Sequence, residues 1–268
     1  MDRLNRLRAQ ARIVLRKPEA WRVSRARRLS DKHHYLTVCA IFKNEGRFLR
    51  EWMAFHRSIG AEHFYLYNNN SSDDFRSEID SEFVTLTDWP TRDMPQKHAY
   101  WHCIHTFGRQ SRWIAFIDID EFLFSPTQQD IRPILRKHEN APAIRIDSPF
   151  FGTSGRQQIP ESVPLSFTKR SATRFSTKSI VDPRYVHRIE NAHEFKYFAM
   201  NQVRPPLDVL RINHYWSRSF EDLAVKVRRG DAWDGYKREM DKHLIFEATL
   251  NEIEDRSIFC RLTRSTEP

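Results

Sequence analysis

The sequence predicts an α/β protein with a mixed, mainly parallel sheet flanked by helices. Three observations support this fold class. Apolar runs of strand length alternate with segments of helical spacing between residues 35 and 117. This alternation is typical of βαβ units, in which each helix returns the chain to a parallel strand. Beyond Pro126 the pattern changes to short strands, polar turns and a few helices, which indicates an α+β second half.

In the first half, strands are predicted where apolar residues run continuously, as in YLTVCAIF, and helices where apolar residues share one face. Phe48, Trp52 and Phe55 share such a face, and Gly60 is a natural helix stop. The predicted elements are, in order, a strand at Tyr35–Phe42, a helix at Gly46–Ile59, a strand at Glu62–Tyr67, a polar loop and helix start at Asn68–Asp74, a strand at Phe83–Leu86, a helix at Pro95–Phe107 and a strand at Trp113–Ile117.

The second half has shorter elements and no linker or internal repeat that would divide it from the first. We therefore expect one domain over residues 35–268, preceded by a basic arm over residues 1–34. The elements predicted here are a helix near Asp130–Glu139, strands at Ala143–Asp147, Pro149–Gly155, Leu165–Arg170, Ser176–Val181 and Val209–Asn213, and helices near Phe220–Arg229 and Lys237–Thr249.

The charge of the chain is concentrated in the arm. Residues 1–34 contribute +8 of the net charge of +9, so the body is nearly neutral and is not expected to bind nucleic acid. Near-helical spacing of apolar residues in the arm favours an amphipathic helix on an anionic membrane, and a solvated tail is the alternative. The absence of a signal-like or spanning segment, together with three scattered cysteines, predicts a cytoplasmic protein, peripheral on the inner face of the membrane if the arm binds lipid.

The most informative motif is the acidic segment that follows WIAFI. Asp118, Asp120 and Glu121 emerge directly after an apolar strand, where open α/β sheets bind ligands. Clustered carboxylates repel each other unless a cation neutralises them. Oxygen ligands suit Mn²⁺ or Mg²⁺, which bridge carboxylates to substrate phosphates. In extended backbone the side chains of Asp118 and Asp120 would point the same way, with Ile119 in the apolar layer. A plain polar junction is the alternative.

Two further polar loops are expected at the same edge of the sheet. Lys43, Asn44 and Glu45 follow the first strand, where Glu45 would either stabilise the helix dipole or help to bind a nucleoside. The segment from Asn68 to Asp73 follows the second strand, and its residues are also ordinary turn formers.

The segments KNEGRFLREWMAFHRSIGAEHFYLYNNNSSD, WIAFIDIDEF, PFFGTSG and NHYWSRSFEDLAVKVRRG together resemble glycosyltransferase family 92 and its bacterial family-2-like relatives. The resemblance covers residues 35–230. It implies a GT-A (Rossmann-like) fold with an acceptor-side second half, a UDP-linked donor, Mn²⁺ (or Mg²⁺) and inversion at the anomeric carbon. One departure is Asn68, where relatives often have Asp at a position that would contact the nucleoside.

The resemblance also implies roles for individual residues. The metal ligands would be Asp118, Asp120 and His214, with Glu121 behind them. The residues assigned to the nucleotide sugar are Lys43, Asn44, Glu45, Asn70, Asp73, Gln96 and Lys178. The residues assigned to the acceptor side are Phe151, Gly152 and Gly155.

The catalytic base is expected among acids near predicted strand ends, which are Glu194, Glu190 and Asp147. Glu194 is preferred because partial burial among aromatic neighbours would raise its pKa toward a useful value. A surface salt bridge is the alternative. His98, His102 and His105 share a predicted helix face beside Cys103, and a partly buried polar face explains them better than zinc does.

The function predicted is therefore transfer of a hexose from a nucleotide sugar to a hydroxyl of a glycan or glycolipid, in surface polysaccharide synthesis. Two other functions compete with it. A metal-dependent nucleotidyltransferase would use the same acids, and a non-enzymatic module would bind RNA or lipid through the basic arm.

Overall fold

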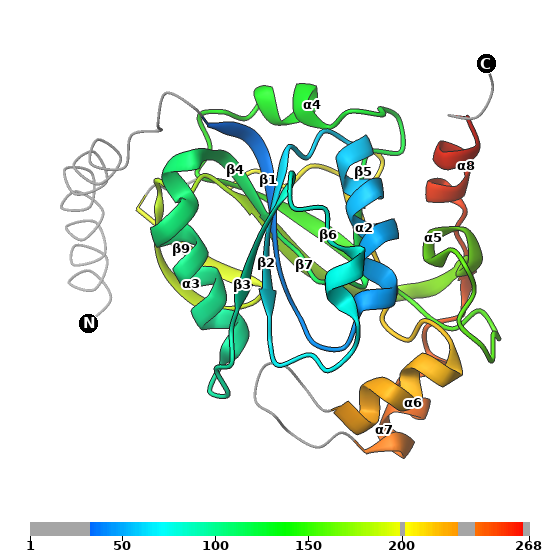
Figure 1. Cartoon of the computed structure of the whole chain (residues 1–268). Helices are drawn as coiled ribbons and strands as arrows, with labels where there is room; N and C mark the ends of the chain where they lie inside the picture. The colour runs from blue at the N-terminus through cyan, green and yellow to red at the C-terminus, as the bar shows by residue number, and fades with distance from the viewer. Residues whose placement is uncertain (1–32, 199–201, 230–238, 265–268) are drawn as a thin grey trace, which may run out of the picture.

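The computed structural model describes residues 33–198, 202–229 and 239–264. The expected arm over residues 1–34, apart from its last two residues, lies outside this range. The sheet has nine strands, of which eight follow the order β3-β2-β1-β4-β7-β6-β10-β5, with β11 added at β7 (Figure 1). The strands are β1 (His34–Phe42), β2 (His63–Asn68), β3 (Val84–Asp88), β4 (Ser111–Phe116), β5 (Glu121–Phe124), β6 (Ala143–Phe151), β7 (Lys169–Val181), β10 (Arg211–His214) and β11 (Ile253–Glu254).

Strand direction divides the sheet into two parts. β3, β2, β1 and β4 are all parallel, whereas β7 runs antiparallel to both β4 and β6, and β5 runs antiparallel to β10. This arrangement confirms a mixed α/β sheet flanked by helices, with a parallel first half and a less regular second half.

The helical segments connect the strands and cover the sheet (Figure 1). Helices are α2 (Gly46–Ser58), α3 (Pro95–Phe107), α4 (Arg132–Arg136), α5 (Val163–Ser166), α6 (Phe220–Arg229), α7 (Met240–Ala248) and α8 (Ser257–Arg264), with short 3₁₀ turns η1 (Phe75–Glu78) and η2 (Gly108–Gln110).

The two faces of the sheet are covered by different elements. Leu36, Val38 and Ala40 of β1 pack in the cluster that holds α2, whereas Cys39 and Ile41 pack in the cluster that holds α3. This alternation follows from the pleat of a strand, and burial on both faces explains the continuous apolar run in β1. A two-stranded hairpin, β8 (Val186–Asn191) and β9 (Glu194–Tyr197), packs on the α3 face.

Several expected elements differ from the structure. The strands expected at Leu165–Arg170 and Ser176–Val181 are wrong as separate units, because α5 occupies the start of that stretch and one long strand, β7, covers the rest. The strand expected at Pro149–Gly155 is the end of β6 followed by a turn. The helix expected near Asp130–Glu139 is shorter than predicted, because α4 has only 5 residues.

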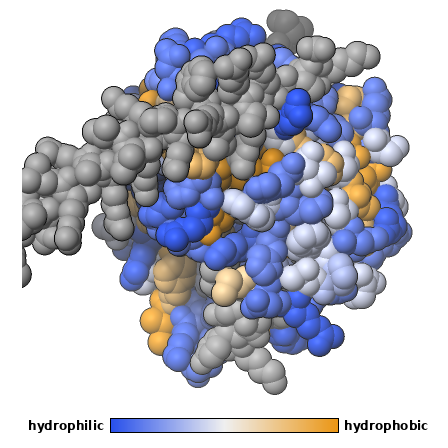
Figure 2. Space-filling model, turned by 90° about the vertical axis from the view of Figure 1, so that its left-hand side faces the viewer, coloured by the Kyte–Doolittle hydropathy of each residue, from blue (hydrophilic) through white to orange (hydrophobic). Residues whose placement is uncertain are grey.

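The surface on the side of α3 and the hairpin is largely hydrophilic among the described residues, with apolar side chains in small separate groups (Figure 2). Within the described ranges, no helix has both the length and the apolar character needed to cross a membrane.

Candidate active site

The acidic segment follows the carboxyl end of β4, which lies beside β1 in the sheet. Because β2 and β4 are the parallel neighbours of β1, the loops that follow these three strands emerge at one edge of the sheet. Ligands of open α/β sheets bind at such an edge. The expected convergence of the three polar loops is therefore confirmed.

Asp118, Ile119 and Asp120 form a tight turn. The backbone N–H of Glu121 donates to the carbonyl of Asp118 (3.0 Å). From α2, Trp52 Nε1 donates to the carbonyl oxygens of Asp118 and Glu121 (3.1 and 2.9 Å). Ile119 is buried in the core as expected, but the expectation of extended backbone is wrong, and the turn brings the two aspartates to different partners.

The carboxylate of Asp118 is held by groups from two other elements. Lys178 Nζ of β7 donates to Asp118 Oδ2 (2.6 Å), and Gln96 Nε2 at the start of α3 donates to Asp118 Oδ1 (2.6 Å). Burial alone would raise the pKa of Asp118, but the charge and the hydrogen bond of Lys178, together with His214, outweigh it and the pKa is lowered. The side chain of Asp118 keeps 30% of its exposure, whereas Lys178 is fully buried behind it. Lys178 therefore faces the carboxylates and is screened from a ligand by Asp118.

Asp120 has a separate set of partners from the second half of the chain. Lys226 Nζ of α6 donates to Asp120 Oδ2 (2.6 Å), and His214 Nε2 at the end of β10 lies 3.4 Å from Asp120 Oδ1. Burial alone would raise the pKa of Asp120, but Lys226 and then His214 lower it well below its usual value. The same lysine also donates to the carbonyl of Trp216 (2.8 Å).

Glu121 links the two aspartates. Its Oε2 lies 3.3 Å from Lys178 Nζ, and its Oε1 lies 3.3 Å from His214 Nδ1. Glu121 Oε1 and His214 Nδ1 are both buried and neither makes a hydrogen bond, which is uncommon for buried polar atoms. Burial raises the pKa of Glu121, although Lys178 opposes this effect. Three carboxylates therefore face two lysines and one imidazole at this point of the site.

The donor set fits a divalent ion in chemistry, and part of it fits in geometry. Carboxylate oxygens with one imidazole suit Mn²⁺. The distance of 3.4 Å between Asp120 and His214 is near the roughly 3 Å that separates adjacent ligands of one octahedral ion. However, in the described ranges no group of three or more His, Cys, Asp and Glu side chains is arranged to hold a metal, and this includes the histidines of α3. In this structure Lys178 and Lys226 provide the positive charges that face the acids.

The first two loops contact each other. Asn44, at φ +53°, accepts from Ser72 N–H (2.7 Å) through Oδ1, and its own N–H donates to Ser71 Oγ (2.9 Å). Asp73 Oδ2 accepts a hydrogen bond from the N–H of Gly46, the first residue of α2 (2.8 Å). This carboxylate therefore binds one of the backbone N–H groups that are unpaired at the start of a helix. Asn44 and Asp73, both expected to bind the nucleotide sugar, thus join the two loops.

The remaining loop residues differ in exposure. Lys43 is half-buried and Asn70 is exposed. Glu45 is buried and its Oε1 lies 3.3 Å from Arg218 Nη2. Arg218 also pairs with Asp222 of α6 (3.2 Å). This buried arginine joins the loop after β1 to the start of α6, and Glu45, which precedes α2, makes no side-chain capping hydrogen bond to that helix.

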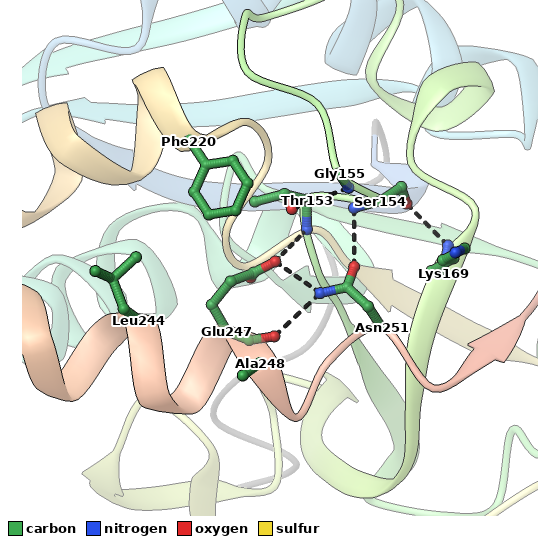
Figure 3. Close-up of a pocket in the computed structure, with 9 residues that line it drawn as sticks. All are labelled: Thr153, Ser154, Gly155, Lys169, Phe220, Leu244, Glu247, Ala248 and Asn251. Atoms are coloured by element: carbon green, nitrogen blue, oxygen red, sulfur yellow. Dashed lines mark hydrogen bonds between the residues drawn. The ribbon is translucent and has the colours of Figure 1, made fainter.

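On the side expected to bind the acceptor, a turn after β6 is held by α7 (Figure 3). Glu247 Oε1 accepts from Thr153 N–H (2.7 Å), and Asn251 Oδ1 accepts from Ser154 N–H (2.8 Å). The other oxygen of Glu247 accepts from the hydroxyl of Ser217, three residues beyond His214. The residues of these hydrogen bonds on the turn and at α7 line a cavity of about 350 Å³.

The three residues predicted for the acceptor side, Phe151, Gly152 and Gly155, have different surroundings. Phe151 is fully buried and packs against Tyr215 (5.0 Å between ring centroids). A Cβ on Gly152 would lie 2.5–2.7 Å from the amide group of Asn251, whereas Gly155 borders the cavity and a Cβ there would meet nothing within 4 Å. Phe151 and Gly152 are thus packing positions, and Gly155 faces open space.

The expected environment of the catalytic base is wrong. Glu194 is exposed, and hydrogen bonding to Lys196 lowers its pKa. Glu190, on the same hairpin, pairs with Arg188. Asp147 pairs with Arg204 (2.6 Å).

These three acids also lie on the opposite face of the sheet from Lys178. The hairpin with Glu190 and Glu194 packs on the α3 face of the sheet. Asp147 is the β-ladder partner of Thr177, the neighbour of Lys178, and adjacent strand residues point to opposite faces. Because Glu194 is exposed, burial does not raise its pKa, and the argument for Glu194 as the base does not hold.

Several residues of the site were not identified from the sequence. Lys226 lies in the quoted segment NHYWSRSFEDLAVKVRRG, whose lysine could have been given a role there. Arg218 lies in the same segment, but no pattern in the sequence indicates its pairing with Glu45. Tyr100 was hidden on an apolar helix face, yet its hydroxyl accepts from Gln96 Nε2 (2.9 Å).

The fold and this site define an α/β protein with a charged ligand site at the carboxyl ends of parallel strands. Comparison with known proteins then identifies the family. The model of glycosyltransferase family 92 matches residues 34–257, and the chain belongs to that family. The resemblance noted in the sequence is thereby confirmed.

Individual relatives agree with this assignment. A glycosyltransferase family 92 protein of Ricinus communis is 30% identical over 74% of this chain and 38% of its own length. Another, of Oryza sativa subsp. japonica, is 34% identical over 73% of this chain and 35% of its own length. A galactan β-1,4-galactosyltransferase of Arabidopsis thaliana is 26% identical over 37% of this chain and 22% of its own length. The chain spans little more than a third of the length of the first two relatives.

Solved structures are less similar. Rv0371c from Mycobacterium tuberculosis H37Rv aligns over 72% of this chain and 100% of that chain at 9% identity, with a TM-score of 0.38. At this score the superposition adds nothing to the fold as described from its own strands.

Proposed function

We propose that this family 92 glycosyltransferase transfers a hexose from a UDP-linked donor to a hydroxyl of a glycan or glycolipid, with inversion and with Mn²⁺ or Mg²⁺. The observation that supports the proposal most is the contact of Asp120 with His214 (3.4 Å), next to Asp118 at the carboxyl edge of the sheet, within a member of this family. The galactosyltransferase among the relatives supports a hexose donor. The parallel strands followed by an antiparallel β7 are consistent with the GT-A type of fold.

Each residue has a proposed task. Asp118, Asp120 and His214 would hold the ion, and a bound divalent ion would neutralise the developing charge of the leaving diphosphate. Gln96 orients the carboxylate of Asp118 through its hydrogen bond. Lys43 and Asn70 lie in the loops that would border the nucleoside. Lys178 helps to keep Asp118 ionised, and Lys226 helps to keep Asp120 ionised.

A surface polysaccharide or lipid-linked glycan is the acceptor class we propose, with the basic arm on an anionic membrane. A nucleotidyltransferase would use the same acids on a nucleoside triphosphate, but the family assignment does not support that alternative.

A thermal-shift screen tests the donor and the ion together. UDP-, GDP- and CDP-hexoses are each added with and without Mn²⁺ to the full chain. A ligand at 100 times its Kd stabilises the folded state by about 2.7 kcal/mol. We expect the Tm to rise with UDP-hexose and Mn²⁺ together, and with neither alone to the same extent. A rise with nucleoside triphosphates only, accompanied by pyrophosphate release, would favour the nucleotidyltransferase.

A further inference from the structure

The two lysines that contact the aspartates differ in burial and in the number of carboxylates that hold them. Lys178 is fully buried in β7 and lies between Asp118 and Glu121, which is also fully buried. Lys226 lies on α6, keeps 11% of its side-chain exposure, and has Asp120 and the carbonyl of Trp216 as its hydrogen-bond partners. Lys178 therefore has two carboxylates that hold it, whereas Lys226 has one.

A divalent cation on the aspartates would change the balance of charge at these lysines. Both ammonium groups lie 2.6 Å from an aspartate oxygen, so an ion bound to the same carboxylates would lie within a few ångströms of both. At such distances like charges repel strongly in a partly buried site. The lysine that is held by fewer carboxylates and lies closer to solvent is the one that can leave, and that lysine is Lys226.

We propose that Lys226 exchanges partners when donor binds: it pairs with Asp120 in the free protein and with the diphosphate of the nucleotide sugar in the complex. The inference rests on the proposed function, because it requires a donor with a diphosphate. α6 is suited to this exchange, since Arg218, just before the helix, is anchored to Glu45 and Asp222 (3.3 and 3.2 Å). This anchor keeps the start of α6 next to the loop after β1 while the flexible stem of Lys226 turns.

The exchange predicts opposite effects of one substitution on two affinities. In Lys226→Met, Asp120 loses a competing cation, so Mn²⁺ should bind the free protein several-fold more tightly. The diphosphate loses a charge-assisted hydrogen bond, which is worth about 1.5–3 kcal/mol, so UDP at saturating Mn²⁺ should bind roughly 10- to 100-fold more weakly. Mn²⁺ affinity is measured by electron paramagnetic resonance of the free ion, and UDP affinity by calorimetry.

Control variants separate this role from a structural one. Lys242→Met removes an exposed lysine of α7 whose ion-pair partner is Glu239, and it should change neither affinity. Lys226→Arg retains the positive charge and should keep UDP binding within a few-fold of the wild type. Circular dichroism and Tm confirm that each variant is folded, and Lys226→Gln replaces the methionine variant if that one is not.

Each outcome decides the inference. Weaker UDP binding with tighter Mn²⁺ binding supports the exchange. A decrease in both affinities, or no change in either, overturns it while leaving the proposed function intact. If the wild-type chain itself binds no UDP with Mn²⁺, the proposed donor is wrong and this inference fails with it.

Discussion

Asp120 is ionised in this protein because Lys226 and His214 face it. Lys226 Nζ at 2.6 Å and the imidazole of His214 at 3.4 Å lower its pKa well below the usual value. The carboxylate is therefore stabilised by its neighbours rather than destabilised by repulsion. Its ionised form contributes stability above the ordinary pKa of an aspartate, and this contribution decreases as the pH falls toward the lowered pKa.

Asp120→Asn should reduce both activity and stability. The neutral amide cannot replace the carboxylate as a ligand, so transfer measured by UDP release should fall by at least about 100-fold. It also leaves Lys226 without its counterion, so the free energy of unfolding in urea should decrease by about 1–3 kcal/mol. Asp208→Asn, at an exposed position outside the site, is the matched control. Full transfer by Asp120→Asn would contradict the metal–diphosphate interpretation.

His63 makes the stability depend on mildly acidic pH. Burial and the neighbouring His34 lower the pKa of His63 to about 4 from an ordinary value of 6.5. The unfolded chain thus binds a proton that the folded chain does not bind between these values, so the free energy of unfolding falls as the pH drops from 6.5 toward 4. His63→Gln retains a polar partner for Thr85 Oγ1, which lies 2.8 Å from His63 Nε2.

We expect this variant to lose less stability than the wild type between pH 7 and pH 5, as measured by urea unfolding at both values. Parallel curves for the two proteins would show that His63 does not control this dependence.

The turn between β6 and α5 depends on space beside α7. A Cβ on Gly152 would lie within 2.7 Å of the Asn251 amide, which is closer than packed atoms can approach. Gly152→Ala should therefore lower the free energy of unfolding by about 1–3 kcal/mol. The double variant with Asn251→Ala should regain part of this loss, because the obstructing group is removed.

Gly155→Ala is the matched control in the same turn. A Cβ there would meet nothing within 4 Å, but its φ of +79° is unfavourable for alanine. We expect a cost of about 1 kcal/mol from the backbone, with no change when Asn251→Ala is added. Equal responses of the two glycine variants to that second substitution would contradict the packing argument.

Local patterns predicted the helices α2, α3, α6 and α7 and the first strands of the sheet well. The expected bounds of α3 and α6 agree with the structure, because Pro95 begins one apolar face and Phe220 the other. β5 was not predicted, because it starts immediately after the acidic turn and pairs with β10, almost ninety residues later in the chain. The β8–β9 hairpin was also missed, since its strands are short and its apolar residues alternate with charged ones.

Sequence reasoning was weaker for the site than for the fold. The location of Asp118 and Asp120 follows from the strand before them, and the closeness of His214 to Asp120 was expected from the family resemblance. The contact of Lys226 with Asp120 and that of Arg218 with Glu45 depend on how α6 packs, which no local pattern encodes. The base could not be assigned, because burial of Glu194 depends on the face of the sheet that its hairpin covers.

The uneven charge of the whole chain predicts a membrane-binding arm and a neutral body. Residues 1–34 provide +8 of the net charge, and each basic residue near an anionic leaflet contributes about 1 kcal/mol, less at high salt. The full chain should sediment with vesicles that contain anionic lipid at low salt, and a chain that starts at Lys32 should stay in the supernatant. Vesicles of neutral lipid are the control, and equal sedimentation of both chains would rule out a role for the arm.

The acids of the site come from the first half of the chain, and the two lysines and the imidazole that contact them come from the second. During synthesis, a nascent chain that ends after β5 has three adjacent carboxylates and lacks Lys178, His214 and Lys226. Such a chain cannot bury Glu121 without a large desolvation cost. The carboxyl edge of the sheet therefore reaches its final form only after α6 has emerged from the ribosome, and the body should unfold as one cooperative unit, not half by half.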